Sequence, residues 1–199
     1  MATIGNLVVP ANVSPGSPVT YEFVEDLFEQ ITSANDASGI TAAGTSISDA
    51  TTNQALVTVP WSVVQGLTAG NVIELKSYGI MSAPSSGQAT LAFNGYTNGS
   101  GGTALATMTA FTPYASASAA LWEAYMRVSW YSATTVQCII RATYQTAGTP
   151  TFSSYLAGNN SATAVTLVSG AAISLAAVMG SAVSGSSFRA LDGSWDQTA

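Results

Sequence analysis

The chain has 199 residues and a mass of 20.2 kDa, which fits one domain or one domain with a short extra segment. Charged residues make up only 7% of it, against about a quarter of an average soluble domain. With 4 basic residues it cannot neutralise a row of phosphates, which argues against nucleic-acid binding, and with no histidine it has neither a Ser-His-Asp triad nor an imidazole metal site.

The first part of the chain is expected to form an arm that carries the only convincing helix. Ser17 and Pro18 supply an N-cap and a proline at the first helical position. Apolar residues then recur at helical spacing along a predicted helix over about 18–32: Phe23, Val24, Leu27, Phe28 and Ile31. Acidic residues occupy the rest of its surface: Glu22, Glu25, Asp26 and Glu29. Residues 33–53 are small and polar, so we interpret residues 1–50 as an arm made of this helix and a linker.

After about residue 51 the apolar period changes from about 3.6 to 2, which indicates strands. The clearest strand is 121–131, whose alternate residues form one apolar face: Trp122, Ala124, Met126, Val128 and Trp130. A second alternating segment follows it, with one face made by Val136, Cys138, Ile140, Ala142 and Tyr144. Only Ser132 to Thr134 separate the two segments, so we expect them to pair as a hairpin.

Shorter alternating segments and frequent turn signals continue to the end of the chain. One of them places Ala89, Leu91 and Phe93 on one face. About eight to ten such strands predict an antiparallel β-sandwich or jelly roll. The uncharged stretch 164–183 is apolar, but its glycines and hydroxyls and its lack of basic flanks favour two short buried strands over a membrane span. We therefore predict a mainly β fold, with an arm over 1–50, a sandwich over 51–199 and no membrane partner.

The search for catalytic or metal-binding groups finds single residues rather than a constellation. The acids of the predicted helix share one short amphipathic segment with no second ligand set, which favours a solvated or partner-facing surface over a cation site. A hydrolase that uses only carboxylates needs two facing acids, and the strands offer only Glu74 and Glu123. Cys138 shares a face with Val136 and Ile140, so we expect a core residue. We predict no catalytic residue, no cofactor, no metal site and no enzyme activity.

The segment from about residue 53 to residue 158 resembles a pattern found in virion proteins of tailed phages. A Thr- and Asn-rich lead, a strand that ends in proline and an L-x-A-G-N-V-I-x-L motif read here as TTNQALVTVPWSVVQGLTAGNVIELKSYGIMS. A strand leading to G-G-T follows as LAFNGYTNGSGGTALATM. A tryptophan-containing strand and a V-x-C-x-I-R motif then read LWEAYMRVSWYSATTVQCIIRATYQTAGTPTF. Proteins of this group are capsid decoration (cement) proteins, head fibres or tail-appendage modules, and they are typically trimers with a β-sandwich or jelly-roll fold.

The resemblance implies a capsid decoration protein that acts as a homotrimer on the exterior of the virion, after synthesis in the host cytoplasm. The short chain without a repetitive shaft favours a compact capsid-surface protein over a fibre. The implied partners are further copies of the chain and the major capsid protein. The arm would dock on the capsid lattice or clasp a neighbouring subunit. The expected interaction residues lie on the predicted helix and on the polar face of 121–131: Glu22, Phe23, Glu25, Asp26, Leu27, Phe28, Glu29, Tyr125 and Tyr131. The alternative is a head-fibre or tail-appendage module that binds a receptor or surface glycan through loop aromatics such as Tyr96, Tyr114 and Tyr155.

Overall fold

The computed structural model of the chain falls into two compact units, residues 1–37 and residues 38–199. It describes residues 3–4, 7–8, 46–47, 51–97, 102–149, 151–158, 163–164 and 172–198. In the first unit, β1 (Thr3–Ile4) pairs antiparallel with β2 (Leu7–Val8). The predicted helix over about 18–32 lies outside the described residues, so it stays a prediction.

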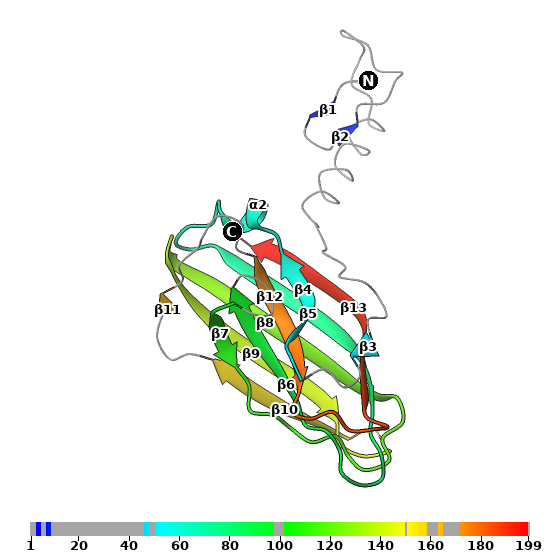
Figure 1. The fold of residues 1–199 in the computed structure, drawn as a ribbon. Helices are drawn as coiled ribbons and strands as arrows, with labels where there is room; N and C mark the ends of the chain where they lie inside the picture. Colours follow the sequence, from blue (N-terminus) through cyan, green and yellow to red (C-terminus); the bar gives the residue numbers. More distant parts are fainter. Residues whose placement is uncertain are drawn as a thin grey trace. The chain divides into compact units, whose positions relative to one another are not determined.

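The second unit is a sandwich of two antiparallel sheets, which confirms the predicted fold class (Figure 1). The large sheet has the order β10 (Phe152–Gly158), β9 (Thr135–Gln145), β8 (Ala120–Ser132), β5 (Val72–Ser82), β13 (Ser187–Thr198) and β3 (Ser46–Ile47), and β11 (Thr163–Ala164) also pairs with β9. The small sheet has the order β4 (Gln54–Val59), β12 (Ile173–Met179), β6 (Leu91–Thr97) and β7 (Ala104–Thr107).

The order of these strands is that of a jelly roll with an extended sheet. Counted along the chain from β3 with β9, β10 and β11 left out, strands one, eight, three and six form β3-β13-β5-β8, and strands two, seven, four and five form β4-β12-β6-β7. The β9–β10 hairpin then widens the large sheet beyond β8. One helical turn that the sequence analysis did not predict, α2 (Trp61–Val64), follows β4. It begins after Pro60 and is too short to show a helical period.

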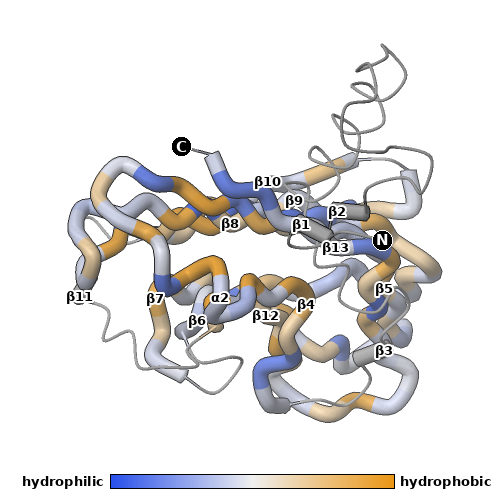
Figure 2. The backbone as a smooth tube through the Cα atoms, turned by 90° about the horizontal axis from the view of Figure 1, so that it is seen from above, coloured by the Kyte–Doolittle hydropathy of each residue, from blue (hydrophilic) through white to orange (hydrophobic). Residues whose placement is uncertain are grey.

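The faces of β8 and β9 are those that the alternating pattern predicts. The residues from Trp122 to Trp130 that were expected in the core are all buried, and so are those from Val136 to Tyr144. The two strands pair antiparallel, with Val128 opposite Cys138, so the expected hairpin is confirmed. Figure 2 shows these strands in one layer and β4, β6 and β12 in the other, with hydrophobic colour recurring along both layers.

The central strands of the small sheet differ from the predicted alternation because both of their faces are covered. In β6, Ala92 and Asn94 are buried as well as Leu91 and Phe93. Asn94 is accommodated because its amide donates to Asn53 Oδ1 at 3.0 Å and its own Oδ1 accepts from the Met108 N–H at 3.2 Å. Strand β12, from the uncharged stretch that resembled a membrane span, lies between β4 and β6 and is mostly buried. Among the helices of the described residues, none is long and apolar enough to cross a membrane.

Candidate interaction surface on the large sheet

The outer face of the large sheet gathers the charged side chains of the sandwich. Every charged side chain that the structure describes comes from β5, β8, β9 or β13, and none of these side chains is buried. They are four acids and four bases: Glu74, Glu123, Asp192, Asp196, Lys76, Arg127, Arg141 and Arg189. The face is therefore charged locally but neutral as a whole. Period-two alternation explains this placement, because each of these strands buries its intervening residues in the core.

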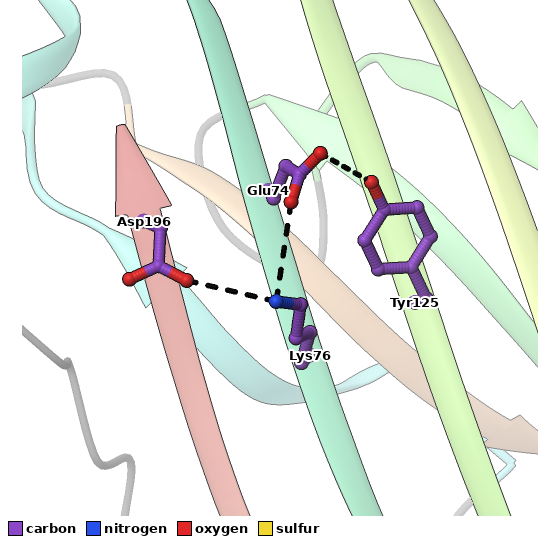
Figure 3. A network of polar contacts seen from close by, with 4 residues as sticks. All are labelled: Glu74, Lys76, Tyr125 and Asp196. Carbon is purple, nitrogen blue, oxygen red and sulfur yellow. Dashed lines mark hydrogen bonds and ion pairs between the residues drawn. The ribbon is translucent and has the colours of Figure 1, made fainter. Parts of the chain in front are cut away.

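A network of contacts joins four neighbouring strands on this face, and Figure 3 shows the part of it that comes from β13, β5 and β8. Tyr125 of β8 donates a hydrogen bond from its hydroxyl to Glu74 Oε1 of β5 at 2.6 Å. The Lys76 ammonium lies 3.9 Å from Glu74 Oε2 and 3.7 Å from Asp196 Oδ2 of β13. On the other side of Tyr125, the Arg141 guanidinium of β9 lies 5.6 Å from the centre of the ring. The network therefore ties side chains across β13, β5, β8 and β9.

The tyrosine at the centre of the network is held in its neutral form. Burial of the hydroxyl, followed by its hydrogen bond to the Glu74 carboxylate, raises the pKa of Tyr125 to about 12. A phenol with this pKa stays protonated at neutral pH and donates to the carboxylate. The expected interaction residue Tyr125 is thus half-buried and already partnered within the sheet.

The other expected residue of this strand, Tyr131, is far more accessible. Its side chain is 59% exposed, and its hydroxyl donates to Gln137 Oε1 at 2.9 Å. The remaining expected interaction residues, Glu22 to Glu29 of the predicted helix, lie outside the described residues. Their role therefore stays a prediction.

Exposed apolar side chains lie on the same outer face, beside the charges. Tyr78 and Leu121 are each 50% exposed, and Phe152 is 46% exposed. These three residues and Glu123 line a shallow hollow of about 240 Å³. A second hollow, of about 380 Å³, adjoins it at Lys76, Tyr78, Glu123, Asp192 and Ser194. A face that mixes accessible aromatic and aliphatic groups with balanced charge has the composition of a protein contact surface.

Sequence reasoning missed part of this surface. Asp196, near the end of the chain, lies in β13 and pairs with Lys76. The neighbouring apolar Trp195 and polar Asp196 were a signal for this strand, because in a strand they point to opposite faces and Trp195 is buried. The accessibility of Phe152 and Leu156 had no signal in the sequence, because apolar residues in a strand are normally expected to face the core.

The two acids that a hydrolase would need are far apart. Glu74 lies opposite Arg127 in the register of β5 and β8, whereas Glu123 lies opposite Tyr78. Four residues of strand separate these two positions, or about 13 Å at 3.3 Å per residue. That exceeds the span of about 5–9.5 Å between the paired carboxylates of glycosidases. Within the described residues, no three His, Cys, Asp or Glu side chains are grouped so that they could hold a metal ion.

Cys138 is a core residue, as expected from the residues with which it shares a face. Its side chain is fully buried, and burial raises the pKa of the thiol to about 12. A thiolate is the reactive form of cysteine, so this side chain is unsuited to act as a nucleophile.

The aromatics of the glycan-binding alternative have separate surroundings. Tyr96 lies in β6 and its hydroxyl accepts from the Asn53 amide at 2.7 Å. Tyr114 is partly buried against the core. Tyr155 lies in β10 and stacks on Tyr144 at 5.8 Å between ring centres. Two of the three are thus strand residues rather than loop residues, and each has contacts of its own.

Comparison with known proteins adds no relative to this description. No protein-family model matches the sequence, and no curated protein matches it significantly.

Proposed function

We propose that the chain is a structural protein of a tailed-phage virion that decorates the exterior of the capsid. The resemblance of residues 53–158 to phage virion proteins supports the class. The observation that carries a structural role is the broad outer face of the large sheet, which combines accessible apolar groups with four acids and four bases. Such a face fits contact with protein partners better than catalysis or metal binding.

The distribution of charge suits a protein that stays assembled. The small sheet contributes no charged side chain in its described strands, and the ion pairs of the large sheet lie within the chain. Permanent interfaces are large and depleted of charge at their centre, with polar groups confined to the rim, so their strength depends little on salt. A decoration protein must hold its place on the capsid through changes in ionic conditions.

The proposed mechanism is mechanical. Homotrimers of the chain bridge adjacent capsomers, and each bridge adds contact area that opposes internal pressure. Residues 1–50 serve as the arm that reaches the major capsid protein, with the side chains of the predicted helix, Glu22 to Glu29, at the contact. The sandwich carries the contacts between copies and the outer surface.

The copy number per virion tests the proposal. Purified virions of the phage that encodes the chain are digested, and the chain is quantified by mass spectrometry against the major capsid protein. Hundreds of copies are expected for a decoration protein. A handful of copies would contradict it and favour the head-fibre or tail-appendage alternative.

A deletion tests the arm separately. Capsids stripped of the protein are incubated with the full chain or with a variant that lacks residues 2–32, and bound protein is measured by sedimentation. The deletion is expected to abolish binding while the sandwich keeps its circular dichroism spectrum. Undiminished binding of the folded variant would show that the arm is not the capsid contact.

A further inference from the structure

Strand β10 is a long and regular strand at an edge of the large sheet. It pairs with β9 over seven residues without any shift in register. The other sheet edges that the structure describes are short or irregular. At the opposite edge of the same sheet β3 has two residues, and at the edges of the small sheet β7 has four residues and β4 pairs with β12 across a register shift.

Among the residues that the structure describes, this edge carries none of the features that usually prevent strands from pairing with other chains. Such features are charged side chains, proline, bulges or a covering segment. The sequence of β10, FSSYLAG, contains no charge and no proline, and its pairing contains no bulge. Six of its seven residues are exposed, among them Phe152 and Leu156, and Leu156 is 74% exposed.

The register shows which backbone groups of β10 face away from the sheet. The Thr146 N–H donates to the Thr151 carbonyl oxygen at 2.8 Å, just beyond the end of the β9–β10 ladder. Because bonded and non-bonded pairs alternate along an antiparallel ladder, the odd-numbered residues of β10 bond to β9. The N–H and C=O groups of Phe152, Ser154 and Leu156 therefore point away from β9.

We propose that β10 pairs antiparallel with β10 of a second copy of the chain, about a two-fold axis at Ser154. This register uses the outward groups of Phe152, Ser154 and Leu156, because Ser154 then bonds to its own counterpart and Phe152 bonds to Leu156 of the second copy. It also brings the exposed Phe152 and Leu156 side chains together as cross-strand pairs on the outer face. The two large sheets become one continuous sheet.

The self-complementary sequence of β10 favours a second copy as the occupant. A strand that pairs with itself about a two-fold axis places the residue on the axis opposite an identical residue. Any charge at that position would face its own sign and oppose the contact. β10 has only serine there, and its apolar residues match each other across the axis. The inference goes beyond the proposed function, since it concerns a two-fold contact that does not depend on a capsid.

Charge substitutions at Ser154 test the register directly. Ser154→Lys and Ser154→Glu each place two like charges opposite one another, so each variant alone is expected to have half the wild-type mass by analytical ultracentrifugation. An equimolar mixture of the two variants is expected to recover the wild-type mass, because the introduced charges then attract. Ser153→Lys is the matched control, since Ser153 would lie opposite Tyr155 of the second copy, and it should keep the wild-type mass.

A cysteine on the axis gives an independent readout. Residues in a bonded antiparallel pair have Cα atoms about 5.5 Å apart, within the range that a disulfide spans. Ser154→Cys is expected to form a covalent dimer on mild oxidation, whereas Ser153→Cys should remain monomeric on a non-reducing gel. The one native cysteine, Cys138, is buried and should not contribute.

The outcomes separate this contact from the other proposals. A wild-type mass equal to that of Ser154→Lys, or a mixture of the two charge variants that fails to recover the larger mass, would overturn the β10 contact. Thermal melting of the variants checks that lost association does not come from unfolding, since Ser154 also shares a hydrogen bond with Thr143. The copy number per virion is measured independently, so either proposal can fail without the other.

Discussion

Tyr125 shows how a residue on the polar face of a strand becomes part of the framework of the sheet. Its hydroxyl bonds to Glu74, and Arg141 lies over its ring. The fold raises the pKa of Tyr125 from about 10 to about 12, so the folded state favours the neutral form of its phenol. The resulting stabilisation is complete below about pH 10 and is lost as the pH rises through 12.

The first prediction is that Glu74→Gln lowers the pKa of Tyr125 part of the way back toward its usual value. The substitution removes the negative charge beside the phenolate, whereas the burial that is the larger cause remains. Ultraviolet titration of the tyrosinate measures the effect, with Tyr125→Phe identifying the contribution of this residue. Glu123→Gln is the control, because Glu123 is not among the groups that shift the pKa of Tyr125. Identical titrations of wild type and Glu74→Gln would contradict the assignment.

The second prediction concerns the thiol of Cys138. Because the side chain is buried and its pKa is about 12, iodoacetamide at pH 8 is expected to leave the folded protein unmodified. In denaturant the same reagent should modify the chain once. Intact-mass spectrometry after a timed reaction distinguishes the two states. Rapid modification under native conditions would mean that the interior opens far more often than the packing implies.

At the scale of elements, neighbouring atoms lie so close to Gly79 and Gly95 that a side chain cannot be added there without a clash. A side chain at Gly79 of β5 would collide with the backbone oxygen of Arg189 on β13 and come within 2.5 Å of the Trp122 ring. A side chain at Gly95 of β6 would come within 2.5 Å of Met126 Sδ across the core. The first glycine allows β5 and β13 to pair, and the second allows the two sheets to pack.

The third prediction is that Gly79→Ala destabilises the sandwich by about 1–3 kcal/mol, the usual cost of overpacking. The obstructing atom at Gly79 belongs to the backbone, so it cannot move aside as a flexible side chain could. Chemical denaturation gives the free energy of unfolding. Gly148→Ala is the matched control, since no atom lies within 4 Å of the added group, and it should change the stability by less than about 0.5 kcal/mol. Equal stability of the two variants would contradict the packing.

At the scale of the whole molecule, charge is divided between the two parts of the chain. Six of the ten acids precede residue 51 and all four bases follow it, so residues 51–199 are neutral and residues 1–50 carry the net charge of −6. The acids and bases of the sandwich balance on the outer face of its large sheet. The proposed capsid contact lies on the acidic arm. Its negative charge would suit a basic surface on the capsid.

The fourth prediction is that the stability of the sandwich depends little on salt. The two ion pairs among its described residues share Lys76, whose side chain is 47% exposed, and exposed pairs contribute about 0–1 kcal/mol. Raising NaCl from about 0.01 to about 0.15 M shortens the Debye length from about 30 to about 8 Å. Thermal denaturation should shift by no more than a few degrees. A large shift in the wild type that Lys76→Met removes would show that the network is a major source of stability.

The sequence by itself determined the fold class and the faces of the strands β8 and β9. Both strands have one solvent-exposed face and one buried face, so period-two alternation indicates which residues lie in the core. It also placed Cys138 in the core and Tyr125 and Tyr131 on the polar face. These inferences depend only on neighbours along the chain.

The tertiary structure decided everything that depends on which strands are neighbours in space. Sheet order made β6 and β12 central and covered on both faces, so alternation could not describe them. It brought Glu74, Lys76, Tyr125 and Asp196 together from three strands. It also left β10 at an edge with its backbone groups and apolar side chains exposed. Pairing between segments that are distant in the sequence creates these features, and the local periodicity of a segment does not indicate which segments will pair.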